Sequence, residues 1–288
     1  VFEIDPGHPA AHAAAARAYL RLGGTNVLAH NDARLSALAE VRKALDGGAD
    51  IAEAHAALAD IKFLYDWDWR GAEREYRRSL DLNPGFIPAR KTFAQMLATR
   101  GRFDEALAIS EETRRIDPQS IDALISHGML LYYRRDFEAA NGVAERVLAE
   151  APANPAGSLL AARVAEAEGR FSDGLALMQQ AWRLAGDGGV NLRVLVIRLQ
   201  ALSGDVDGAR AALTELEQAA GSGAVRLHAR DRALVAVGFG ETADALDAFD
   251  VAFSERDPAL VWLTVDPRVD ALRSEPRFRA MLQKLSLE

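Results

Sequence analysis

The chain contains 288 residues, of which 49% are hydrophobic, and its 42 acidic side chains outnumber 34 basic ones, giving a net charge of -8. The hydrophobic share excludes a disordered chain, and the negative charge opposes direct contact with a nucleic-acid backbone. The absence of cysteine excludes disulfides and a thiolate metal site. No apolar run approaches the ~20 residues of a membrane-spanning helix, so we expect a cytoplasmic protein without membrane contact.

The first elements expected along the chain are a severed helix and a helix pair. Residues Val1 to Ile4 have the pattern of the last turn of a helix that Asp5-Pro6 ends, and no initiator methionine precedes them. We therefore expect a fragment of a longer protein. Apolar periodicity then predicts helices over residues 12–24 and 33–45, joined by a longer connection than those that follow.

A 34-residue period runs through the middle of the chain. Three sets of equivalent residues, which we call columns, keep this spacing. They are Pro84, Pro118 and Pro152, then Trp69, Phe103, Phe137 and Phe171, and finally Ala72, Ala106, Ala140 and Gly174. Between the prolines, apolar residues recur at helical spacing and glycines such as Gly101 end a first helix. Each period therefore predicts two helices, with the aromatic residue at the head of the second, and adjacent pairs must stack to bury their apolar faces.

The period weakens towards the C-terminus. Two further pairs are marked by Gly204 with Val206 and by Gly240 with Phe249, and the last of them closes at Pro258. We expect an array over residues 1–258, with about seven helix pairs of which the first and the last two are degenerate. An apolar stripe after Pro276 predicts that residues 259–288 form capping helices over the last pair.

The segment "YDWDW" at residues 65–69 combines two tryptophans. Trp69 occupies the aromatic column, so we expect it to pack at the turn of one pair. Trp67 falls in the glycine column, which leaves two roles open. It either braces an unusual turn or contacts a partner.

The repeat resembles the tetratricopeptide repeat (TPR) family, whose pattern contains Leu-Gly, A-x3-F and a closing proline. Leu58-Ala59, Ala72 with Tyr76, and Pro84 take these places, whereas His55 stands where the family has tryptophan. The resemblance implies an all-α, right-handed α-solenoid that binds proteins in a concave groove. The C-terminal tail and the "YDWDW" block are similar to repeat regions of bacterial signalling regulators, such as winged-helix transcription factors, nucleotide cyclases and protein kinases, which implies a regulatory context.

Catalytic and metal chemistry find little support in the sequence. His8 and His12 lie four residues apart, but no third ligand is nearby, and His127 sits inside an apolar helix. No nucleophile motif and no phosphate-binding glycine loop is present. We therefore expect no enzyme, no cofactor and no metal.

The resemblance places the groove on the first helix of each pair. The residues that it assigns to partner binding are Arg17, Asp60, Lys91, Gln95, Asp122, Met129, Tyr132, Tyr133, Arg163, Arg198 and Arg230. Two readings stay open, because some of these side chains can brace neighbouring repeats instead. The expected function is a non-catalytic scaffold for a peptide, a protein segment or its own signalling domain. The alternative is a small-molecule sensor coupled to a missing effector domain.

Overall fold

The computed structural model describes residues 7–24, 27–46, 50–186 and 189–285. Within these ranges the regular structure is entirely helical. The helical turn expected at Val1 to Ile4, and the stop at Asp5-Pro6, lie outside the described residues. The chain divides into two compact units, which are described one after the other. Unit 1 comprises Val1–Pro118, Glu255–Thr264 and Gln283–Glu288, and unit 2 comprises Gln119–Ser254 and Val265–Leu282.

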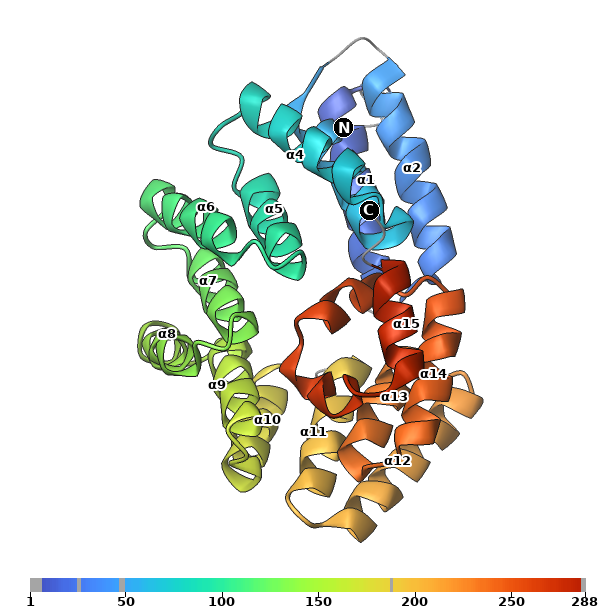
Figure 1. The fold of residues 1–288 in the computed structure, drawn as a ribbon. Coiled ribbons are helices and arrows are strands. Elements are labelled where there is room, and N and C mark those ends of the chain that lie inside the picture. Colours follow the sequence, from blue (N-terminus) through green and yellow to red (C-terminus); the bar gives the residue numbers. More distant parts are fainter. Residues whose placement is uncertain (1–6, 25–26, 47–49, 187–188, 286–288) are drawn as a thin grey trace. The chain divides into compact units, whose positions relative to one another are not determined.

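Unit 1 is built from three helix pairs and a short 3-10 helix (Figure 1). The pairs are α1 (Pro9–Gly24) with α2 (His30–Asp46), α3 (Ala52–Ile61) with α4 (Trp69–Leu82), and α5 (Ile87–Thr99) with α6 (Phe103–Ile116); a π-helix, η1 (Lys62–Asp66), extends α3, and η2 (Pro258–Thr264) is the 3-10 helix. Helix α1 contacts α3, and α3 contacts α5, so the first helices form one layer. A core cluster that includes Leu20, Val41, Ile61 and Tyr65 joins the first two pairs.

Unit 2 contains four helix pairs, drawn from green to orange in Figure 1. They are α7 (Ile121–Tyr133) with α8 (Phe137–Glu150), α9 (Pro155–Ala167) with α10 (Phe171–Leu184), α11 (Gly189–Leu202) with α12 (Val206–Gly221), and α13 (Ala229–Phe239) with α14 (Thr242–Ser254). A 3-10 helix, η3 (Pro267–Leu272), follows, and α15 (Pro276–Leu285) begins in this unit. Contacts of α7 with α9 and of α11 with α13 again place first helices beside one another. Across the described residues of both units, the expected seven pairs are present.

The starts of the second helices follow the 34-residue aromatic column. Helices α4, α6, α8 and α10 begin at Trp69, Phe103, Phe137 and Phe171, as the spacing predicts. Before α4 and α8, the side chains of Asp68 and Asp136 accept a hydrogen bond from a backbone N–H of the first turn, which caps the helix. Gly101 has a positive φ of 74°, the left-handed conformation that ends α5.

Small residues let the two helices of a pair approach closely. Ala72, Ala106 and Ala140 are fully buried on the second helices. On α7, a Cβ atom added at Gly128 would lie 2.5 Å from Cδ2 of Leu160 and 2.7 Å from Cγ1 of Val143. A methyl group at this position would force these side chains to shift, so the close approach favours glycine.

Candidate functional site

All the predicted groove residues lie on first helices. In unit 1, Arg17 lies on α1, Asp60 on α3, and Lys91 and Gln95 on α5. In unit 2, four of them lie on α7, namely Asp122, Met129, Tyr132 and Tyr133, while Arg163 lies on α9, Arg198 on α11 and Arg230 on α13. We call α1, α3 and α5 the first-helix layer of unit 1, and α7, α9, α11 and α13 the first-helix layer of unit 2.

The four predicted residues of unit 1 form a half-buried polar row. The hydroxyl of Tyr76 donates a 2.6 Å hydrogen bond to Oδ1 of Asp60. Burial raises the pKa of Asp60 to about 6, although the bond from Tyr76 and the charge of Arg17 act in the opposite direction. The Arg17 guanidinium lies 5.6 Å from the ring centroid of Phe86. The row therefore combines a carboxyl group that titrates near neutral pH, two cations and an amide.

The "YDWDW" block receives part of the C-terminal segment, which we define as residues 255–285. The guanidinium of Arg256 lies 4.8 Å from the ring centroid of Trp67 and donates to the backbone oxygen of Tyr65 at 3.1 Å. Trp67 itself has a φ of 56°, so it occupies the left-handed conformation between η1 and α4. A contact with its own chain favours the bracing role for Trp67.

Trp69 is 6% exposed, which confirms that it packs at the turn of a pair. Its ring centroid lies 5.5 Å from that of Phe63, whose ring meets Trp262 of the C-terminal segment edge-on at 6.2 Å. The indole N–H of Trp69 donates to the backbone oxygen of Leu285 at 2.8 Å. The aromatic residues of this block thus hold the chain's own C-terminal segment within unit 1.

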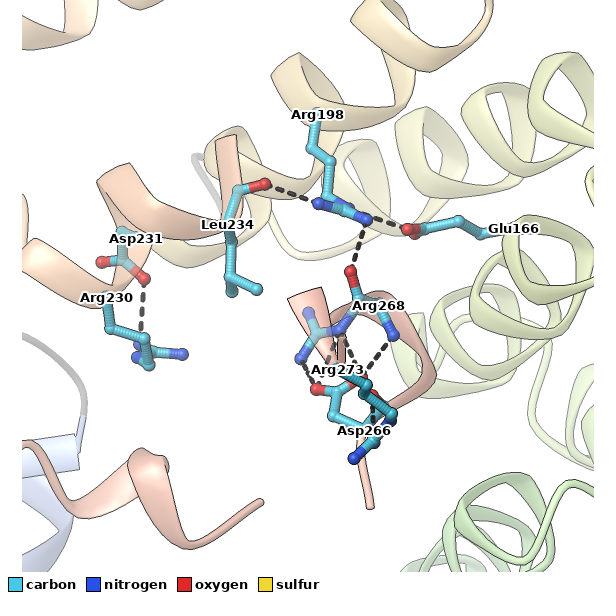
Figure 2. Close-up of polar contacts among 8 residues, drawn as sticks. All are labelled: Glu166, Arg198, Arg230, Asp231, Leu234, Asp266, Arg268 and Arg273. Atoms are coloured by element: carbon cyan, nitrogen blue, oxygen red, sulfur yellow. Dashed lines mark hydrogen bonds and ion pairs between the residues drawn. The ribbon is translucent and has the colours of Figure 1, made fainter. Parts of the chain in front are cut away.

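In unit 2, three predicted groove residues are buried. Tyr132 is fully buried, Tyr133 is 8% exposed and Arg198 is 4% exposed. Figure 2 shows Arg198 reaching three groups on different elements: its Nε donates to Oε1 of Glu166 at 2.7 Å, Nη1 to the backbone oxygen of Leu234 at 2.6 Å, and Nη2 to the backbone oxygen of Arg268 at 2.9 Å. Arg198 therefore joins α9, α13 and the C-terminal segment.

The C-terminal segment also contributes its own ion pair to this layer. Asp266 accepts hydrogen bonds from the backbone N–H of Arg268 at 3.0 Å and from its Nη2 at 2.5 Å (Figure 2). Burial raises the pKa of Asp266, but the charge and hydrogen bonds of Arg268, with the charge of Arg163, outweigh this effect and lower it to about 2. Asp266 is consequently ionised at neutral pH although it is only 2% exposed.

The sequence reasoning missed a second, shorter repeat inside the C-terminal segment. Four columns recur every nine residues, namely Asp257, Asp266 and Glu275; Pro258, Pro267 and Pro276; Leu260, Val269 and Phe278; and Leu263, Leu272 and Met281. All six apolar residues in these columns are at most 3% exposed. The nine-residue spacing of the three prolines is the sequence signal of this repeat, and it is independent of the 34-residue period.

Two negative findings apply to the part of the chain that the structure describes. No helix there is long and apolar enough to cross a membrane. No three His, Asp or Glu side chains among those residues are grouped closely enough to hold a metal ion.

In each unit, helix pairs stack on one another and their first helices form one layer. This arrangement defines a helical repeat protein. No protein-family model and no curated protein matches the chain. Solved structures do: a tetratricopeptide repeat protein from Parabacteroides merdae has a TM-score of 0.57 at 14% identity and covers 89% of this chain and 99% of its own.

Two other solved structures share the same architecture. PilW, a widely conserved type IV pilus biogenesis factor, has a TM-score of 0.56 at 18% identity, covering 73% of this chain and 92% of its own. TTC0263, a TPR protein of Thermus thermophilus, has a TM-score of 0.54 at 18% identity, covering 64% and 98%. These similarities establish the TPR fold for this chain, which confirms the all-α fold class predicted from the repeat.

Proposed function

We propose that this chain is a non-catalytic interaction module that binds a peptide, a protein segment or a signalling domain of its own parent protein. TPR-type layers support this proposal because they present side chains from successive repeats along one extended surface. A protein partner is favoured over a nucleic acid because the net charge of -8 repels phosphates.

The observation that carries the proposal is the polar row of unit 1. Arg17, Asp60, Lys91 and Gln95 are half-buried on three first helices that contact one another in sequence. Guanidinium, ammonium and amide groups are suited to the carbonyl and carboxylate groups of an extended peptide. Partial burial increases the strength of such contacts, since the surroundings screen charges less than bulk water does.

The first-helix layer of unit 2 has a different status in this proposal. Tyr132, Tyr133 and Arg198 are buried, and Arg198 binds the C-terminal segment. Asp122 is exposed, and Met129, Arg163 and Arg230 are half-buried. A partner that used this layer would therefore meet the C-terminal segment, so we place the primary binding surface on unit 1.

The test begins with peptides selected by display against the wild-type protein. Their dissociation constants are measured by fluorescence anisotropy with Arg17→Ala and Lys91→Ala, each of which we expect to weaken binding at least about fivefold. Arg115→Ala, an exposed change on α6, serves as the matched control and should leave affinity unchanged. Equal affinity in all three variants would refute the assignment of the polar row.

A regulatory context is proposed from the similarity of the "YDWDW" block and the C-terminal tail to repeat regions of bacterial regulators. The upstream coding sequence of the parent gene tests this point directly, because a signalling domain there is the expected result. Heat released on binding a small metabolite, with no peptide binding, would instead support the ligand-sensing alternative.

A further inference from the structure

The C-terminal segment has the form of a bound ligand that the chain carries itself. Its nine-residue unit begins with an acidic residue and proline, followed by apolar residues three and six positions after the acidic one. Asp257 and Asp266 each accept a hydrogen bond from the backbone N–H two residues later, at 2.8 and 3.0 Å, which starts a 3-10 turn. Two successive units are therefore held in the same local conformation.

The unit around η3 meets the first-helix layer of unit 2. Helix η3 contacts α9 and α13, and Val269 and Leu272 are at most 1% exposed. Arg198 binds the segment through the backbone oxygen of Arg268, a contact that does not depend on the side chain at that position. The layer thus recognises a turn that begins with an acidic residue and proline. It does so through the backbone of the turn and through the two apolar side chains of the turn.

The same layer offers more polar groups than η3 uses. The hydroxyl of Tyr132, Nε of Arg163 and Oε2 of Glu166 are buried and have no hydrogen-bond partner among the described residues. Tyr132 is fully buried, and the charges of Asp266, Arg163 and Glu166 all act on its hydroxyl. Because an unsatisfied buried polar atom is costly, a ligand that supplied partners to these atoms would bind better than the resident unit.

We propose that the first-helix layer of unit 2 is a binding face for protein segments that resemble η3, and that η3 is its resident ligand. Such a segment begins with an acidic residue and proline, and it has apolar residues three and six positions after the acidic one. This inference rests on the proposed interaction function and names the partner class of a second face. An external segment would need to displace one nine-residue unit only. Two buried apolar side chains are then exchanged for two others, so the cost of release is recovered on binding.

The test uses the full chain with η3 weakened by Val269→Ser and Leu272→Ser, which we call the opened variant. The probe is a fluorescein-labelled synthetic peptide of residues 264–274, followed by fluorescence anisotropy. We expect it to bind the opened variant at least about tenfold more tightly than the wild type, whose tethered η3 competes at high effective concentration.

Two altered peptides provide matched controls. Asp266→Asn in the peptide removes the buried charge and should weaken binding at least about fivefold. Asp270→Asn removes an exposed pair with Arg135 and should change affinity less than about twofold. The proposal is overturned if a folded opened variant fails to bind the peptide, or if the Asp266→Asn peptide binds as well as the unaltered one.

A second arrangement applies if the opened variant does not fold. A protease site inserted between the exposed residues Ser254 and Glu255 produces a nicked protein that retains every residue. The labelled peptide of residues 264–274 should bind this nicked protein, and the Asp266→Asn peptide should bind it at least about fivefold more weakly. A nicked protein with native circular dichroism that binds neither peptide, or binds both equally, would overturn the proposal. Neither arrangement uses the polar row of unit 1, so failure here leaves the proposed function of that row standing.

Discussion

At the scale of single residues, Asp60 couples the polar row of unit 1 to pH. Its pKa is raised by burial to about 6, compared with 3.8 for the free side chain. Between these values the unfolded chain loses the Asp60 proton while the folded chain keeps it, so the free energy of unfolding falls as pH rises. The loss is complete above the folded pKa and amounts to at most about 3 kcal/mol.

The substitution Asp60→Asn tests this linkage. The amide does not titrate and can still accept the hydrogen bond from Tyr76, so we expect the variant to gain stability relative to wild type as pH rises from 4 to 7. Urea unfolding at pH 3.5, 5 and 7 measures the difference. Between pH 3.5 and 7 the difference should grow by one to three kcal/mol, on the order of the linkage above. A constant difference would show that Asp60 is not perturbed.

Individual roles were partly predictable from the sequence. Trp69 could be placed because it shares a column with three phenylalanines, and every predicted groove residue could be assigned to a first helix. The burial of Tyr132 and Arg198 could not, because it depends on residues 266–268, more than sixty positions further along the chain. Helical periodicity reports which face a residue occupies but carries no information on what covers that face.

At the scale of elements, two glycines of the α7 and α8 pair have opposite roles. A Cβ atom at Gly128 would lie 2.5 Å from Leu160, whereas one at Gly142 in α8 would meet nothing within 4 Å. Gly128→Ala should therefore destabilise the protein by about 1–3 kcal/mol through overpacking. Gly142→Ala should stabilise it by about 0.5–1 kcal/mol, because alanine restricts the unfolded chain and favours a helix interior.

Chemical denaturation of both variants at one pH tests the pair of predictions. We expect the same substitution to lower the free energy of unfolding at Gly128 and to raise it at Gly142. A general effect of added methyl groups cannot produce opposite changes within one helix pair. Stabilisation by Gly128→Ala would mean that α7 and its neighbours are farther apart than the structure indicates.

Elements were predictable where the 34-residue period holds and not where it fails. Helix starts at Trp69, Phe103, Phe137 and Phe171 follow from a repeated turn and an aromatic residue, and a side-chain cap is added only before Trp69 and Phe137. The 3-10 helices η2 and η3 lie in the C-terminal segment, which lacks that period, and the π-helix η1 directly precedes Trp67, where the glycine column is interrupted. Their geometry is set by packing of the C-terminal segment, as with Trp67 against Arg256, and short helical runs have no strong local signal.

At the scale of the whole molecule, the C-terminal segment supplies core residues to each unit. The apolar side chains of this segment that are at most 9% exposed are Leu260, Val261, Leu263, Val265, Val269, Leu272, Phe278, Met281 and Leu285. Burying one such side chain contributes about 1.5–3 kcal/mol. For nine side chains this gross contribution exceeds the ~5–15 kcal/mol of net stability typical of a folded domain. Removing the whole segment is therefore far more damaging than displacing the single η3 unit.

A chain truncated after Ser254 should accordingly lose its cooperative thermal transition and bind a hydrophobic dye, as apolar faces in both units become exposed. Coexpression of residues 255–288 as a separate peptide should restore the transition, because the contacts of the segment do not require a covalent link. Arg279→Ala, an exposed change on α15, is the matched control and should leave the melt unaltered. If the truncated chain melted like the wild type, the segment would be an accessory to a core complete without it, and its buried side chains would contribute little to stability.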